Sequence, residues 1–402
     1  MSGNGSRAER RRNEGVLGLG LAVGAVGLYV GSRYLARRAH KAAGAGLVDW
    51  DRAEQIAVSR LNRAPGALPQ SELREAERFY DRTMRDVVPL LEAQLGLPLP
   101  GVVERYAVVD RAGWARANLA TFQRLIGQLE PHLVPAVDER SLAAGVVRLA
   151  NRVVSTQQVG FLLGYLGTRV LGQYDIALLS AESKPGQLLF VEENIRSTAS
   201  TLGVPLDDFR TWIALHETTH AFEFEANAWL RPYLSERLER QLAGILDQAR
   251  SLQAEGLGQL LRRLRDSGGN PITGLMSAEQ RRLFDETQLV MSLLEGFSDW
   301  VMDEVGAQLL ADVGLIRQRF EARRNQRRTG LDRIIARLTG LDLKLEQYRR
   351  GERFVSGVAA AGGREAIALL WAGPWALPTA DELADPPAWV RRVAPHVLVP
   401  SG

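Results

Sequence analysis

His216, Glu217 and His220 form the sequence HETTH, in which two histidines four residues apart enclose a glutamate. On a helix, side chains four residues apart project from one face, so both imidazoles can reach one ion at about 2.0–2.1 Å. Glu217 then leans over the ion without binding it, which is the place of a general base for a zinc-activated water. The motif predicts a hydrolytic site with one Zn²⁺ per chain and Glu217 as its catalytic base. The alternative is a pair of helix histidines that holds no metal.

A catalytic zinc ion takes three protein ligands and keeps one position open. The chain has five histidines and no cysteine, so a carboxylate is the better third ligand. Glu223 shares the face of the two histidines, but it would crowd the ion along a line. We therefore predict Glu295, on a second helix, as the third ligand. Asp299 is predicted to accept the free N–H of a ligand histidine, and His216 is the expected donor. The alternative is that Glu295 and Asp299 form an acidic pair that faces solvent.

Two helices must position these residues. Pro205, followed by Asp207 and Asp208, predicts the start of the histidine-bearing helix, and Pro232 predicts its end. The sequence SAEQ at 277–280 is a capping-box start for the second helix. Apolar residues continue at helical spacing from there through Glu295 and Asp299, which lie four residues apart on one face.

The rest of the chain predicts a mainly α fold with a small β-sheet, in a single large helical domain. Helical spacing covers Asp51–Asn62, Ser71–Leu95 and Gly113–Leu129. Short apolar runs predict strands at Tyr106–Asp110 and Leu188–Val191, with a weaker third at Ile176–Leu179. The segment DSGGNPITG at 266–274 is the clearest predicted loop.

Residues 1–45 form a basic leader, and residues 46–402 form the predicted catalytic domain. The leader holds eight basic and two acidic residues, a net charge of +6, whereas the whole chain carries +3. The body is therefore about −3, which gives no basis for nucleic-acid binding. The apolar run at about 16–36 lies between arginines and predicts a single membrane anchor, with the body weakly favoured on the cytoplasmic side. A signal peptide or a peripheral helix is the alternative.

The substrate side of the site is less sharply defined by the sequence. The predicted strand Leu188–Val191 could pair along its edge with an extended substrate, and Asn194 and Tyr174 are candidate substrate-binding residues. An oxyanion-stabilising group is expected, and Tyr165, Tyr174, His132 and nearby arginines are its candidates.

The E-x-x-x-D arrangement of Glu295 and Asp299 after HExxH resembles the thermolysin-like gluzincins, although Leu294 stands where those proteins have asparagine. A broader resemblance is to the zinc-dependent metallopeptidase family of actinobacteria and Chloroflexi, which is associated with deazaflavin-coenzyme biosynthesis. It rests on eight segments between Val48 and Val393: VDWDRAEQIA, VVDRAGWARANLATF, GFLLGYLGTRVLGQYDIALL, LLFVEENI, FRTWIALHETTHAFEF, SLLEGFSDWVMD, GLDLKLEQYRRGERFV and DPPAWVRRV. This resemblance implies a zincin-like catalytic core in a mostly helical fold, and it implies no particular substrate.

The favoured function is a zinc metallopeptidase that cleaves a peptide or protein substrate, with no predicted oligomeric state. Two other functions stay open. One is a zinc hydrolase of a non-peptide amide or ester in cofactor metabolism. The other is a zinc-holding, membrane-associated scaffold without turnover, which would have no need of Glu217.

Overall fold

The computed structural model describes residues 46–98, 101, 104–133, 142–174, 186–255, 277–324 and 341–395. The leader with its predicted anchor, the weaker predicted strand Ile176–Leu179 and the predicted loop 266–274 lie outside these ranges. Within them, no helix combines the length and apolar character needed to cross a membrane.

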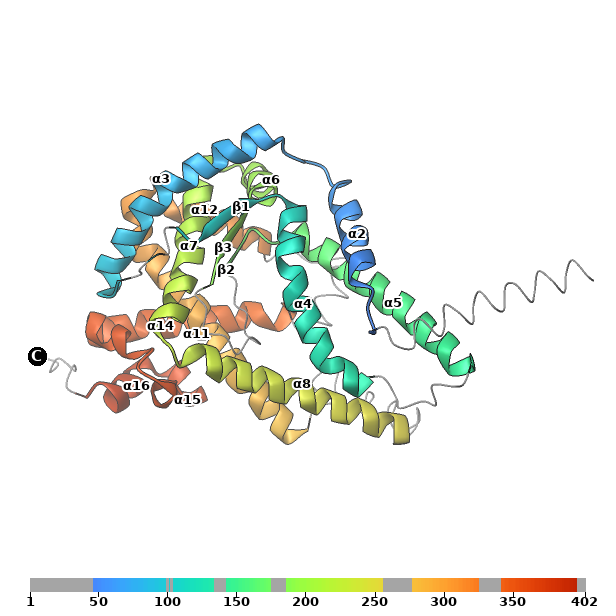
Figure 1. Ribbon diagram of the computed structural model, residues 1–402. Helices are drawn as coiled ribbons and strands as arrows, with labels where there is room; N and C mark the ends of the chain where they lie inside the picture. The colour runs from blue at the N-terminus through green and yellow to red at the C-terminus, as the bar shows by residue number, and fades with distance from the viewer. Residues whose placement is uncertain are drawn as a thin grey trace, which may run out of the picture.

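The chain folds mainly into α-helices around a small sheet, as the sequence predicts (Figure 1). Three predicted helices are confirmed as α2 (Trp50–Leu61), α3 (Gln70–Leu95) and α4 (Arg111–Leu133), with ends that differ from the predicted ones by four residues at most. The remaining helices before the C-terminal region are α5 (Leu142–Gly167), α6 (Glu192–Leu202), α7 (Leu206–Ala226), α8 (Leu230–Glu255), α11 (Ala278–Leu309) and α12 (Val313–Arg324). The C-terminal region contains α14 (Leu341–Leu369), the 3₁₀ turn η1 (Pro374–Ala376), α15 (Ala380–Ala384) and α16 (Pro386–Val393).

The sheet has three strands in the order β1-β3-β2. The predicted strands are confirmed as β1 (Tyr106–Val109) and β3 (Leu188–Val191), which pair in parallel. The third strand is β2 (Gly172–Tyr174), antiparallel to β3, which the sequence did not predict. β3 is central and all four of its residues are buried, so the predicted substrate-pairing edge at β3 is wrong. Both sides of β3 are already occupied by neighbouring strands.

α7 lies at the centre of the molecule, between the sheet, α3 and α11 (Figure 1). The main core surrounds it and includes Phe209, Leu215 and Phe222 of α7 itself. On one side, α2, α4 and α5 pack together around a second, smaller core. On the other side, α14 and α16 extend the main core. A helix buried on most sides is rigid, which suits one that carries a site.

The predicted end of the histidine-bearing helix at Pro232 is wrong. α7 ends at Ala226, where the Asn227 side chain donates a 2.8 Å hydrogen bond to the Glu223 carbonyl. α8 begins at Leu230, and Pro232 lies in its first turn, where the missing N–H of proline leaves no helical bond unmade. The predicted capping box of α11 is confirmed at Ser277 and Gln280.

α11 and α14 cross in very close contact at two glycines. A Cβ atom on Gly351 would lie 1.9 Å from the Ser292 carbonyl oxygen, and one on Gly296 would lie 2.3 Å from the Gly351 carbonyl carbon. Only glycine fits at such a crossing. Because Glu295 directly precedes Gly296, this contact fixes the part of α11 that faces α7.

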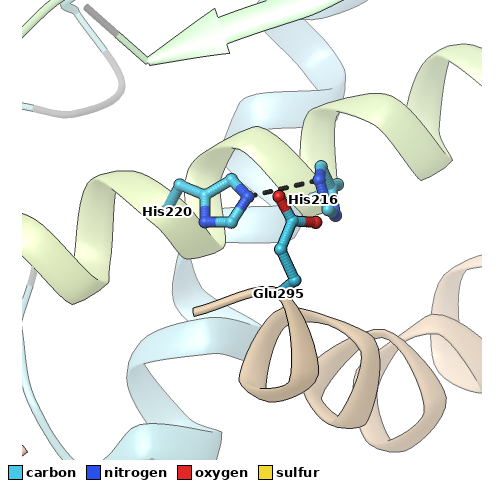
Figure 2. Close-up of side chains that lie close together, drawn as sticks. All are labelled: His216, His220 and Glu295. Carbon is cyan, nitrogen blue, oxygen red and sulfur yellow. Dashed lines mark hydrogen bonds between the residues drawn. The ribbon is translucent and has the colours of Figure 1, made fainter. Parts of the chain in front are cut away.

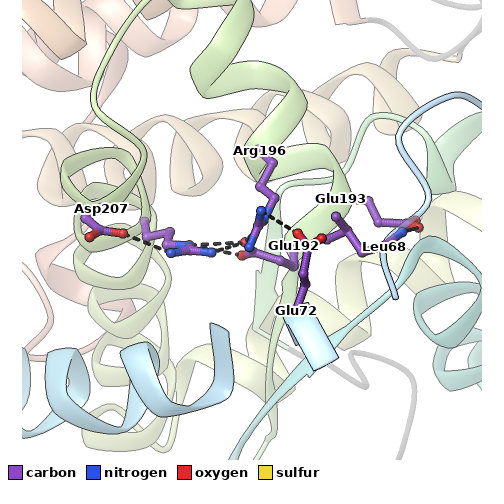
Figure 3. Close-up of polar contacts among 7 residues, drawn as sticks. Leu68, Glu72, Glu192, Glu193, Arg196 and Asp207 are labelled. Carbon is purple, nitrogen blue, oxygen red and sulfur yellow. Dashed lines mark hydrogen bonds and ion pairs between the residues drawn. The ribbon is translucent and has the colours of Figure 1, made fainter. Parts of the chain in front are cut away.

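A buried ion-pair network ties the start of α7 to α6 (Figure 3). The fully buried Glu192 accepts from Arg210 of α7 and, at 2.8 Å, from Arg196. Arg210 also donates to Asp207 at 2.9 Å, and Arg196 reaches Glu72 of α3 at 2.7 Å. The predicted start of this helix is confirmed, because α7 begins directly after Pro205 with Asp207 and Asp208 in its first turn.

Candidate active site

His216, His220 and Glu295 converge, two from α7 and one from α11 (Figure 2). One ligand atom from each residue lies within 4.8 Å of the others. The Nε2 atoms of His216 and His220 are 3.2 Å apart, and the Glu295 carboxylate rises towards them. The predicted ligand set is therefore assembled by the fold, since Glu295 lies 79 residues after His216 in the sequence (295 − 216).

This geometry fits a zinc ion. Two nitrogens at 2.0–2.1 Å from one tetrahedral ion are separated by about 3.3 Å, close to the 3.2 Å between the two Nε2 atoms. Two imidazoles and one carboxylate are also the ligand types of catalytic zinc sites that keep a fourth position open.

Glu217 lies against strand β2. A Cβ atom on Gly172 would be 2.5 Å from the Glu217 Cγ atom, so the strand backbone passes directly over this side chain. Glu217 is 8% exposed, and burial raises its pKa to about 7, while the charge of His220 and a hydrogen bond from the Tyr174 backbone N–H oppose the rise. A carboxylate that is packed in this way has a fixed orientation beside the two histidines.

A cavity of about 340 Å³ opens next to these residues. His216, Glu217, Glu295 and Asp299 all line it, together with an apolar wall that includes Trp212 and Phe320. The Trp212 and His216 rings are nearly parallel, with centroids 6.1 Å apart. A substrate in this cavity would meet both the predicted base and the predicted ligands.

Asp299 lies one turn after Glu295, and both are half-buried within a stretch of α11 that is otherwise buried. A solvent-facing acidic pair, the alternative considered above, is at odds with this position in the cavity wall. Asp299 is also near Arg317 of α12, whose pKa is raised against the effect of burial by Asp303 first and then by Asp299. The role of Asp299 as the hydrogen-bond partner of His216 stays a prediction.

A model of zincin-like metallopeptidases matches residues 48–390, which is most of the chain. The chain belongs to this zincin-like metallopeptidase family. A solved structure from Chloroflexus aurantiacus, described as a "putative hydrolase with a novel fold", is 36% identical and has a TM-score of 0.63. The match covers 86% of this chain and 98% of that one. No curated protein matches the chain. Family membership supports an enzyme of the hydrolase class that binds zinc, and it confirms the resemblance drawn from the sequence.

In this zincin-like chain, Glu223 holds a position that the sequence did not assign. Its Oε2 atom is 2.7 Å from Nδ1 of His220, and the Ser298 hydroxyl of α11 is 3.3 Å from the same nitrogen. Burial alone would lower the pKa of His220, but the Glu223 carboxylate raises it. The spacing of three residues from His220 was the available signal, and it pointed equally well to a metal ligand.

The two candidate substrate-binding residues do not line the cavity. Asn194 is buried and donates to the carbonyls of Gly167 and Val170 at 2.8 and 2.7 Å, while it accepts from Arg111 at 2.6 Å. These bonds hold the turn between α5 and β2. The Tyr174 hydroxyl donates to Glu225 at 2.8 Å. Their side chains thus support the elements next to the site.

Among the candidates for oxyanion stabilisation, two arginines border the cavity. Arg169 and Arg317 line it, whereas Tyr165 does not. The Arg169 guanidinium lies 3.6 Å from the centroid of the Tyr165 ring, which holds it in place by a cation–π contact. The side chain of His132 lies outside the part of the chain that the structure describes.

Proposed function

We propose that the chain is a zinc-dependent metallopeptidase, with His216, His220 and Glu295 holding one Zn²⁺ and Glu217 acting as general base. The observation that carries the proposal is the position of Glu217, which is fixed against β2 while it borders the cavity beside two of the three ligands. A scaffold that merely holds zinc would need neither the Glu217 carboxylate nor a cavity beside the metal ligands.

The chemistry follows from these positions. Bound zinc would supply Lewis-acid chemistry, which acidifies water and polarises a carbonyl. Glu217 accepts a proton from the attacking water while the water oxygen bonds to the scissile carbonyl carbon. Glu217 then passes that proton to the amine nitrogen as the carbon–nitrogen bond breaks, so that it ends as it began.

The edge of β2 supports a peptide substrate. The Val191 N–H donates to the Leu171 carbonyl at 2.8 Å, which makes this a hydrogen-bonded pair of the antiparallel ladder. The next pair, Gly172 with Phe190, is then a non-hydrogen-bonded pair, so the N–H and C=O of Gly172 point away from β3. Gly172 also lines the cavity. An extended peptide could pair with this backbone, as peptides do at other sheet edges.

The test is cleavage of a peptide library by the purified full-length chain, with its metal content measured. Glu217→Gln should keep zinc and lose roughly 10²–10⁴-fold in cleavage rate, whereas His216→Ala should lose zinc. Glu236→Gln, the same change at an exposed position on α8, should leave both unchanged.

Three results would count against the proposal. Full activity of Glu217→Gln would remove the base mechanism. A wild-type protein without zinc after purification in metal-containing buffer would remove the site. Turnover of non-peptide amides or esters, with no peptide cleaved, would assign the same site to the other substrate class.

A further inference from the structure

Glu223 is a fully buried carboxylate, with 0% of its surface exposed, on the same helix as the two histidines. Its Oε2 atom lies 2.7 Å from Nδ1 of His220. Its Oε1 atom has no hydrogen-bond partner among the residues that the structure describes. One contact to one imidazole is therefore the main polar interaction of this side chain.

That arrangement is a poor way to stabilise a fold. Moving a carboxylate out of water is strongly unfavourable, and a single partner with one oxygen unpaired does not offset that free energy well. On the neighbouring helix α6 the chain pairs a buried carboxylate fully, since Glu192 accepts from both Arg196 and Arg210. The contrast points to a role for Glu223 at His220.

The position of Glu223 also excludes it as a metal ligand. It contacts Nδ1 of His220, whereas the Nε2 atom faces Nε2 of His216, where the three ligand atoms converge. Nδ1 and Nε2 lie on different edges of the ring, so the carboxylate is on the side away from the ion. An ionised carboxylate only accepts hydrogen bonds, which places the proton of a neutral His220 on Nδ1.

We propose that Glu223 is a positioning residue that holds His220 in the Nδ1–H tautomer, with the Nε2 lone pair aimed at the zinc site. This inference rests on the proposed function, because it assumes that His220 binds zinc. Such carboxylate partners fix the orientation of a histidine ligand and raise its basicity, and their loss typically weakens metal binding by about 10–100-fold. Glu223 thereby takes, for His220, the part that the sequence suggested Asp299 takes for His216.

The experiment measures zinc affinity by competition with a chelator, using full-length wild type, Glu223→Gln and Glu223→Ala. Glu223→Ala should raise the dissociation constant by about 10–100-fold. Glu223→Gln should raise it less, by about 3–10-fold, because its amide oxygen still accepts from Nδ1 but carries no charge. The visible spectrum of the Co²⁺-loaded protein should change in both variants, since it reports ligand geometry without any need for activity.

Phe222→Leu is the control, because Phe222 is buried next to Glu223 on the same helix and the substitution removes packing but no polar atom. Its zinc affinity should equal that of wild type. The proposal is overturned if Phe222→Leu loses as much affinity as Glu223→Ala, or if both Glu223 variants stay within about twofold of wild type. If Glu223→Ala does not fold, the nearly isosteric Glu223→Gln tests the proposal, and a zinc affinity within about twofold of wild type overturns it. A wild type that binds no zinc would instead refute the proposed function.

Discussion

Gly172 approaches Glu217 so closely that no side chain fits between them. A methyl group at this position would lie 2.5 Å from Cγ and 2.7 Å from Oε1 of Glu217. Gly172→Ala should therefore push the base away from its position while the three metal ligands stay in place. Because a displacement of about 1 Å can cost roughly 10²-fold in rate, we expect kcat to fall by about that factor at unchanged zinc content.

Gly127→Ala in α4 is the matched control, since a Cβ atom there meets nothing within 4 Å. Its kcat should equal that of wild type. If Gly172→Ala is as active as wild type, the close packing of β2 on Glu217 is not required for catalysis.

Single residues of the site differ in how far the sequence alone could reveal them. The sequence HETTH can be recognised as a metal motif because its two histidines lie on one face of a single helix. Glu295 and Asp299 can be recognised because they are charged residues within an apolar helical stretch. Glu223 was visible as a neighbour on the same face. Its contact with Nδ1 depends on the rotation of the His220 ring, which the surrounding helices decide. Residue spacing along the sequence therefore predicted the metal ligands but not the role of Glu223 at His220.

At the scale of elements, the Glu192–Arg210 pair fixes α7 against α6. Glu192 is fully buried and Arg210 is 5% exposed, so removing the arginine leaves a carboxylate without its main counter-charge. Arg210→Met should lower the free energy of unfolding by about 3–5 kcal/mol. Urea denaturation of the full-length chain measures it.

Arg196→Met provides the comparison, because Arg196 contacts the same carboxylate from a more exposed position, with 27% of its side chain accessible. We expect a loss of about 1 kcal/mol or less for this change. If both variants lose the same free energy of unfolding, burial does not make the Glu192–Arg210 pair more stabilising than the exposed pair.

The short helix α15 carries a pH-dependent contribution to stability. The pKa of Glu382 is lowered, first by its hydrogen bond with Arg392 and also by the Thr379 backbone N–H, against the effect of burial. A lowered pKa in the folded state means that the carboxylate stabilises the fold above its ordinary value of 4.5. This stabilisation is lost as the pH falls through the lowered value.

Glu382→Gln should therefore be less stable than wild type at neutral pH, by about 1 kcal/mol or less, because the amide keeps the capping bond to Thr379 but loses the ion pair with Arg392. The difference should shrink as the pH falls below the ordinary glutamate pKa of 4.5. Urea midpoints at a series of pH values measure the effect, with Asp381→Asn, an exposed neighbour, as control. A difference in the free energy of unfolding that stays constant as the pH falls until the wild type unfolds would contradict the assignment.

The two short strands show why elements are unevenly predictable. β3 has four consecutive apolar residues, which is typical of a buried strand, and its bounds match the prediction. β2 is only Gly172, Gln173 and Tyr174, with neither alternation nor β-branched residues. β2 forms a strand because it pairs with β3 and packs against α7. The edge that faces the cavity was therefore assigned to the wrong strand.

At the scale of the whole molecule, the apolar spacing was enough to predict a mainly α fold with a small sheet. The arrangement of the helices was not predictable from it. Glu295 meets His216 and His220 because α11 is clamped onto α14 at Gly296 and Gly351. Nothing in the local pattern around these glycines indicates which helix they contact. The Chloroflexus protein shares this arrangement with a TM-score of 0.63, over the 86% of the chain that the match covers.

The leader raises the question of where this enzyme works. We propose that the apolar run at 16–36 anchors the chain to a membrane, because the run is uncharged from Val16 to Val30 and flanked by arginines. The full-length protein should then stay in the membrane fraction after an alkaline wash, which removes peripheral proteins. Replacing both Leu21 and Val26 by Asp should release it, since each charge costs about 2.5–3.5 kcal/mol at the centre of a membrane helix. Ser2→Asp with Ser6→Asp adds the same charge outside the run at 16–36 and should leave the protein bound. Release of the wild type by the wash would refute the anchor, and the hydrolase site would be unaffected.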